Sequence, residues 1–477
     1  MKKMKLWMLA AILTFSGATM LTSCSDDNDS PKTNTERERF EKQLTVTLDN
    51  AAEQAQLDPT IKAIEILTSF TNQLNGEAVG RQALKIALEI MGDAYTERPT
   101  CDMLSFSDLG EREQEARRSL KSLLGLEEAS QLLLVNAKNS IGNRHVTFTQ
   151  GQKEAELTED DAFVIEYKDV EAGETTELRF EFGDDTDGII VWVTNLYGTP
   201  IAVQFPANIN FTVSTGKTGE GREVTSGTAY LSTLDGSKWF LPKETHWLAN
   251  VTISSGVNGR TEDITATMSH DAEGAWNVSA GMNINGHGVL SLTANGLRDR
   301  YTDDELEQYS DMLEMSRGYR VAYRLLRVFN VRTIDALILT VDEDLTISCQ
   351  VSDAAKALQT LGNVHTLRHN NGTEADVEPL TKQLNELVTF TASQQSTDIE
   401  AEGSLITSFI DNIWQPAPAL RFKGETDYLS MYERLSQHDL DNYYKLLDTF
   451  DPPYRSIQQL VDAIEEKGKE ITGVFKF

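Results

Sequence analysis

The stretch from Trp276 to Asn285, WNVSAGMNIN, decides the fold. Its apolar side chains (Trp276, Val278, Ala280, Met282 and Ile284) alternate with polar or small ones (Asn277, Ser279, Gly281, Asn283 and Asn285). Successive side chains of a β-strand point to opposite faces, so this period of two is typical of a strand with one buried and one wet face. The pattern predicts a strand in which Trp276 belongs to the core.

The same period recurs through the middle of the chain. Apolar sets at 178/180/182, 209/211/213 and 264/266/268 alternate with Arg, Glu, Asn, Thr and Ser. Asp-Gly pairs at 187–188 and 235–236 and Asn-Gly pairs at 258–259 and 285–286 mark tight turns between the runs. We therefore predict a meander of eight to eleven antiparallel strands from about 144 to 295, with an apolar face and a Ser/Thr/Asn face.

Before residue 144 the apolar period is 3.6, which is typical of helices. Asp58-Pro59 begins one of them, because Asp suits the N-cap and Pro the first helical position. Further helices are predicted at about 78–95, 110–125 and 127–138. Their short connections favour antiparallel packing into a bundle.

After the meander, the capping-box pattern Thr302-x-x-Glu305 predicts the start of a long helix. Strands are expected at 333–341 and 344–351, and helical segments at 353–362, 375–391, 427–449 and 454–468. The fold class predicted is α+β, with an N-terminal helical bundle, a large antiparallel meander sheet and a mixed helical C-terminal part. The corresponding regions are 36–143, 144–300 and 301–477, and the last is expected to pack on the sheet.

The first residues have the pattern of a secretory signal: three lysines, an apolar run from Leu6 to Phe15, then small residues. The apolar run is about half as long as a bilayer span requires. Leu21-Thr22-Ser23-Cys24 resembles the lipobox of bacterial lipoproteins. That resemblance implies a signal peptide at 1–23, cleavage before Cys24, and acyl chains on Cys24 that hold the chain to a membrane.

Ser25-Asp26-Asp27-Asn28-Asp29 resembles the acidic tether of surface-exported lipoproteins of Bacteroidota. The resemblance implies a flexible tether at 24–35 and a lipid-anchored protein of the outer membrane that faces the cell exterior. It covers only about 30 residues and says nothing of the body of the chain.

The formal charge is −31, and removal of the three signal lysines with no acidic residue leaves −34. Such a charge repels polyanions, and no dense basic cluster is present, so nucleic acid is excluded as a partner. Two cysteines remain after the lipobox, Cys101 in an expected loop and Cys349 in an expected strand. Outside the cytoplasm they could form a disulfide, but the sequence does not show whether they meet.

The sequence contains no G-x-S-x-G, S-x-x-K or H-E-x-x-H motif, which favours a protein that is not an enzyme. His365 and His369 have the spacing of zinc ligands on a helix, yet the Asn-Asn-Gly that follows predicts a loop. Asp184–Gly188 resembles half of a calcium loop and is better explained as a hairpin turn. No cofactor, metal site or catalytic residue is therefore predicted.

Three functions remain open. We prefer a surface lipoprotein that binds a glycan or another envelope component, because the sheet is expected to have a wet polar face. Aromatic residues that could stack on sugar rings lie along the meander: Trp192, Tyr197, Trp239, Phe240, Trp247 and Trp276. The alternatives are a carrier of a lipid or other apolar ligand inside a curved sheet, and a hydrolase with an unrecognised site.

Overall fold

The computed structural model describes about three quarters of the chain. The described residues are 35–54, 58–95, 101–105, 131–140, 144–183, 188–196, 199–217, 223–236, 246–257, 260–298, 300–315, 319–320, 322–323, 326, 330–370, 372–410, 412–431, 439, 441–442 and 451–474. They form two compact units: unit 1 comprises the chain up to Gln56 and Glu273–Asp451, and unit 2 comprises Leu57–Ala272 and Pro452–Phe477. The fold is α+β with a large antiparallel sheet, as predicted.

Unit 2 contains most of the predicted meander. Its strands are β3 (Arg144–Thr149), β4 (Glu156–Glu159), β5 (Phe163–Asp169), β6 (Glu174–Phe182), β9 (Asn208–Lys217), β10 (Glu223–Thr233), β11 (Trp247–Val257) and β12 (Arg260–His270). Their order is β12-β11-β10-β9-β6-β5-β3-β4, with β3 and β5 parallel and the other pairs antiparallel. Phe180 lies opposite Phe211 and Phe182 opposite Ile209, so the alternating apolar residues share one face as predicted.

A second, four-stranded sheet of unit 2 corrects the predicted helix at 127–138. Its strands are β1 (Cys101–Ser105), β2 (Gln131–Asn136), β7 (Ile189–Leu196) and β8 (Thr199–Phe205), in the order β1-β2-β8-β7. Within 131–138, the described part of the predicted segment, only Ala137 and Lys138 are helical, at the start of α6 (Ala137–Ser140). The run Leu132-Leu133-Leu134-Val135 is apolar throughout, and such a run suits a strand as well as a helix. Cys101 is the first residue of β1, so the loop predicted there is wrong. The helix predicted at 110–125 lies outside the described residues.

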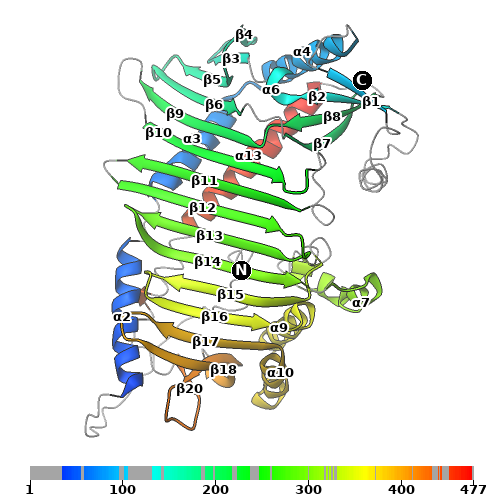
Figure 1. Ribbon diagram of the computed structural model, residues 1–477. Coiled ribbons are helices and arrows are strands. Elements are labelled where there is room, and N and C mark those ends of the chain that lie inside the picture. The colour runs from blue at the N-terminus through cyan, green and yellow to red at the C-terminus, as the bar shows by residue number, and fades with distance from the viewer. Residues whose placement is uncertain are drawn as a thin grey trace. The chain divides into compact units, whose positions relative to one another are not determined.

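Helices cover one face of the unit 2 sheet. α3 (Asp58–Gln73) and α13 (Asp451–Val474) lie on the same side of β9 to β12, as Figure 1 shows. α3 contacts β9, β11 and β12, and its Phe70 packs with Val146 and Phe148 of β3. α4 (Gly76–Tyr95) follows α3 and contacts β1. We call this side of the sheet the covered face.

A buried carboxylate joins α3 to the covered face. Glu262 of β12 is fully buried, and its Oε2 accepts hydrogen bonds from the backbone nitrogen of Thr60 at 2.9 Å and from Thr60 Oγ1 at 2.7 Å. Thr60 lies in the first turn of α3, where backbone N–H groups have no partner within the helix and the helix dipole favours negative charge. Glu262 thus caps α3 from the sheet.

Unit 1 continues the meander pattern in chain order. Its strands are β13 (Trp276–Ile284), β14 (His287–Arg298), β15 (Thr333–Val341), β16 (Leu345–Val351), β17 (Val388–Gln394), β18 (Ile399–Ile410), β19 (Ile413–Arg421) and β20 (Leu429–Ser430). Each pairs antiparallel with the next. Trp276 is only 3% exposed, which confirms its predicted place in the core. Asn285 and Gly286 form the predicted tight turn with φ of 50° and 82°.

Strands β17, β18 and β19 are a correction, since helical segments were expected to dominate this part of the chain. The helix predicted at 375–391 is α10 (Glu374–Leu387), which ends where β17 begins. β19 was not predicted because it contains Pro416 and Pro418, and proline is rare inside sheets. Among the described residues, β20 pairs with β19 only at Ala419 and Leu420. The missing N–H groups of Pro416 and Pro418 therefore interrupt no hydrogen bonds between these two strands.

The helices of unit 1 pack across strand ends and on one face. α2 (Glu36–Gln54) lies across the ends of β14 to β18 (Figure 1), and its Gln43 and Thr47 donate to Asp344 at 3.1 and 2.7 Å. Arg37 of α2 is buried and forms a bidentate ion pair with Glu425. α10 contacts β17, β18 and β19, and α9 (Ala354–His369) precedes it.

The helix predicted to begin after Thr302 is present but short. Thr302 and Glu305 form the predicted capping box of α7 (Asp303–Glu307), and a 3₁₀ turn at Ser310–Leu313 follows. The expected long helix is therefore interrupted after Glu307, and the described residues 319–320, 322–323 and 326 are helical again. Among the described residues, no helix is both long and apolar enough to cross a bilayer.

Candidate polar network and binding face

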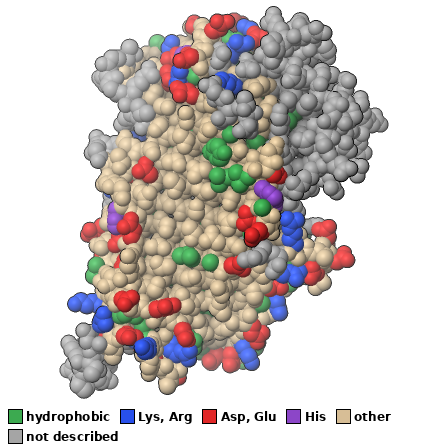
Figure 2. Space-filling view, in the orientation of Figure 1, with side chains coloured by type: hydrophobic (Ala, Val, Ile, Leu, Met, Phe, Trp, Pro, Cys, Tyr) green, Lys and Arg blue, Asp and Glu red, His purple; other side chains and the backbone are tan. Residues whose placement is uncertain are grey.

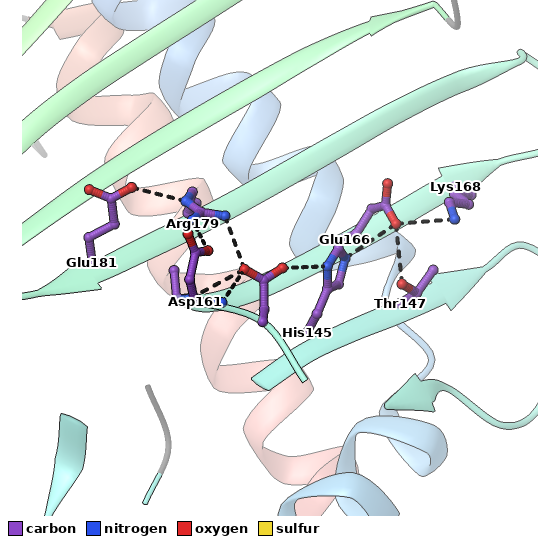
Figure 3. A network of polar contacts seen from close by, with 9 residues as sticks. His145, Thr147, Asp161, Glu166, Lys168, Arg179 and Glu181 are labelled. Atoms are coloured by element: carbon purple, nitrogen blue, oxygen red, sulfur yellow. Dashed lines mark hydrogen bonds and ion pairs between the residues drawn. The ribbon is translucent and has the colours of Figure 1, made fainter. Parts of the chain in front are cut away.

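A network of charged side chains joins β3, β5 and β6 of unit 2 (Figure 3). His145 comes from β3, Glu166 from β5 and Arg179 from β6, while Asp160 and Asp161 precede β5. His145, Val164 and Arg179 are register partners, so they point to one side of the sheet. That side is opposite to the covered face.

Both ring nitrogens of His145 face carboxylates. Nδ1 lies 3.1 Å from Asp160 Oδ2, and Nε2 lies 3.4 Å from Glu166 Oε2 without the geometry of a hydrogen bond. A neutral imidazole has a single N–H and can donate to one carboxylate only. Protonation of His145 would supply the second donor and ion pairs on both sides.

The carboxylates of the network have several partners each. Glu166 Oε2 accepts from Thr147 Oγ1 at 3.2 Å and lies 3.2 Å from Lys168 Nζ. Arg179 contacts Asp160, Asp161 and Glu181 (Figure 3).

The carboxyl group of Asp160 has a lowered pKa. A side-chain hydrogen bond with Asp161 lowers the pKa of Asp160 to about 2, with smaller contributions from the Asp161 backbone amide and His145 against the opposing effect of burial. Asp161 and Glu181 act on Arg179 in turn and raise the pKa of its guanidinium. Asp160 is therefore ionised across the physiological range.

The arrangement favours a structural role over catalysis. An Asp–His pair is part of many general-base sites, but such a site needs the base within hydrogen-bond reach of a nucleophile. Here the hydroxyl of Thr147 donates to Glu166, and both nitrogens of His145 are directed at carboxylates. The network holds the segment before β5 against β3 and β6.

The same side of the sheet carries rows of hydroxyl and amide groups. Thr265, Thr252, Thr228 and Asn210 are successive register partners on β12, β11, β10 and β9, and Thr212, Ser226 and Ser254 form the adjacent row. We call these seven residues the hydroxyl face. They have the opposite orientation to Glu262, because neighbouring positions of a strand point to opposite sides. The predicted Ser/Thr/Asn face is thus present opposite the helices.

The hydroxyl face is open and largely uncharged. Asn210, Ser226 and Thr228 are exposed, and Figure 2 shows mostly uncharged side chains and backbone over β9 to β12. Asn250 donates to Thr267 at 2.8 Å and Ser254 to Asp263 at 2.6 Å, so cross-strand bonds orient part of the surface. The spacing between strands sets neighbouring residues of one row about 5 Å apart.

The predicted aromatic platform is not found where it was expected. Trp247 and Trp276 are 2% and 3% exposed, so Trp247 belongs to the core and cannot stack on a ligand. The side chain of Trp192 and all of Tyr197, Trp239 and Phe240 lie outside the described residues. The sequence analysis missed a different aromatic pair, Phe409 and Trp414, because neither β18 nor β19 was predicted as a strand.

The remaining candidate residues are placed as follows. His365 and His369 lie in α9, so the predicted loop is wrong, and the His365 ring packs 5.9 Å from that of Tyr319. In the described part of the chain, no group of three His, Cys, Asp or Glu side chains is arranged to hold a metal. Residues 184–187 of the calcium-like segment and Cys24 lie outside it.

Cys349 is a free thiol in this structure and is buried in β16. Burial raises its pKa to about 12. The side chain of Cys101 is not among those described, so a disulfide between the two stays a prediction.

Comparison of this chain with protein-family models, with curated proteins and with solved structures finds no match.

Proposed function

We propose that the chain is a lipoprotein anchored through acyl chains on Cys24 at the outer surface of the outer membrane, and that it binds a neutral glycan on its hydroxyl face. The openness of that face is the observation on which the binding proposal depends. Seven uncharged polar residues in two cross-strand rows line it, and three of them are exposed.

The chemistry of the face suits a neutral, hydroxyl-rich ligand. Hydroxyl and amide groups donate and accept hydrogen bonds as sugar hydroxyls do. The formal charge of −31 opposes anionic polymers, while a neutral polymer has no such penalty.

An aromatic ring borders the same rows. Tyr230 of β10 lies between its register partners Asn208 and Asn250. An aromatic ring beside amide groups can contact the apolar C–H face of a sugar while the amides bind its hydroxyls. This combination supports a glycan over a peptide ligand.

Binding is tested with the mature full-length chain in detergent against immobilised neutral polysaccharides. Thr228→Lys places a long charged side chain on the hydroxyl face and should reduce retention at least tenfold. Val170→Lys makes the same change in charge at an exposed position of the β5–β6 turn and should leave retention unchanged. Equal retention of both variants would overturn the hydroxyl face as the binding surface.

The anchor is tested separately. Palmitate fed to cells should label the chain, and Cys24→Ala should give unlabelled precursor of unprocessed size. Protease added to intact cells should degrade the wild-type chain if it faces the exterior. An unlabelled, freely secreted wild-type chain would contradict the lipoprotein proposal.

A further inference from the structure

We propose that Phe409 and Trp414, near the tip of the β18–β19 hairpin in unit 1, form a stacking platform for a sugar ring of a neutral glycan. This inference rests on the proposed glycan binding and assigns it a second contact surface. The two residues are register partners on β18 and β19. Their ring centroids lie 5.1 Å apart with the ring planes tilted by 50°.

Phe409 is unusually exposed for its type. Its side chain is 54% exposed, whereas Phe40, Phe70 and Phe422 are between 1% and 4% exposed. Single exposed apolar residues are common, but an exposed aromatic ring in contact with a second one concentrates apolar area at one place. Amphipathic aromatic surfaces of this kind are enriched where proteins bind other molecules.

α10 holds the hairpin in place and leaves the Phe409 ring exposed. Asn385 of α10 donates to the Leu405 carbonyl at 2.7 Å and accepts from the Leu405 amide at 2.8 Å. One step along β18, Thr407 Oγ1 donates to Thr381 at 2.9 Å. Leu405, Thr407 and Phe409 share one side of the strand because they alternate. The contacts with α10 therefore fix the strand, and Phe409, one step beyond them, stays exposed.

The hairpin itself carries little charge, which favours a neutral ligand. The sequence from Ser404 to Leu420 contains a single charged residue, Asp411, although 25% of the chain is charged. A lone acidic residue repels an anionic lipid surface and offers little to a basic peptide. The apolar C–H face of a neutral pyranose can lie against an aromatic ring without leaving a charge unpaired.

The platform is tested on the mature full-length chain with the neutral polysaccharide that binds best in the immobilised panel. Phe409→Ala and Trp414→Ala should each weaken binding about two- to tenfold, as expected for the loss of one aromatic contact. Ile464→Ala is the matched control, since Ile464 is also 54% exposed but lies on α13. Phe409→Trp should retain binding, because it keeps a ring at the position.

Fluorescence provides a readout that a loss of folding would not produce. Saturating oligosaccharide should shift the tryptophan emission of the wild-type chain to shorter wavelength, and Trp414→Ala should abolish the shift while its thermal unfolding is unchanged. If Thr228→Lys abolishes binding and both aromatic variants bind like Ile464→Ala, the platform is wrong and the hydroxyl face stands. If the wild-type chain binds no neutral polysaccharide, both proposals are wrong.

Discussion

The two faces of the unit 2 sheet are made by the same strands but differ in what lies against them. On the covered face, Phe70 of α3 packs with Val146 and Phe148, and Glu262 is fully buried beneath the first turn of α3. On the hydroxyl face, Asn210 and Thr228 are exposed. Residues that are adjacent in sequence therefore experience opposite environments, and neighbouring substitutions should have very different effects. Two pairs of variants test this contrast directly, and two further experiments test the charged network and the faces of the unit 1 sheet.

The largest effect is expected from a cavity on the covered face. Phe70→Ala removes a side chain that is 4% exposed and should lower the free energy of unfolding by about 3 to 5 kcal/mol. Thr228→Ala on the hydroxyl face should change it by less than about 0.5 kcal/mol. Urea unfolding followed by circular dichroism measures both, and a loss of similar size in the two variants would contradict the contrast.

A smaller loss is expected from removal of the buried carboxylate. Glu262→Ala leaves the Thr60 amide and hydroxyl without their acceptor and should cost about 2 to 4 kcal/mol. Asp263→Ala, one position along β12, removes the acceptor of Ser254 on the opposite side and should cost about 1 kcal/mol or less. If the Asp263 variant were the less stable of the two, the assignment of the faces would be wrong.

The charged network predicts a pH dependence of stability. The pKa of Asp160 is lowered from 3.8 to about 2, so the folded state favours its ionised form. The resulting stability is present above about pH 4 and is lost as the pH falls toward 2. Solvent screening limits the loss to about 1 to 2 kcal/mol.

Asp160→Asn checks this pH dependence. Its free energy of unfolding should fall less than that of the wild-type chain between pH 5 and 2.5, in urea titrations at fixed ionic strength. Parallel curves for the two proteins would show that Asp160 does not contribute.

The smallest expected effect is on the rate of reaction with a thiol reagent and not on stability. Cys349 on the α10 side of unit 1 is buried with its pKa raised to about 12, so a thiol reagent at pH 8 should react at least tenfold more slowly than after unfolding. Ser348 is its neighbour on the opposite side of β16. In a Cys101→Ala background, Ser348→Cys should add one rapidly labelled thiol, and slow labelling at that position would contradict the assignment of faces in unit 1.

Sequence reasoning succeeded where the period of two was long and unbroken. The alternation at 178–182 and 209–213 predicted both the strands and their faces, because one side of each strand is buried and the other is wet. It failed at β2, where a continuous Leu-Leu-Leu-Val run has no alternation to distinguish strand from helix. It also failed at β19, where prolines concealed the strand.

The candidate sites show the same division. The hydroxyl face was predicted because Ser, Thr and Asn recur at alternate positions. The network around His145 was not predicted, since it joins Asp160, Glu166 and Arg179 through the registers of three strands and one connection. Trp247 was assigned to a platform because the sequence shows the type of residue but not which way its ring points.

The division of the chain into two units limits where the chain can be cut and affects how it folds. Arg37 and Glu425, which are 388 positions apart, form one ion pair within unit 1, while the chain between Gln56 and Glu273 makes up most of unit 2. The last helix returns to unit 2. Any single cut therefore leaves at least one of the two units without a segment that belongs to it. Most of the polypeptide must be present before Arg37 of α2 can contact Glu425. Contacts of such long sequence separation should make folding of unit 1 slow and late.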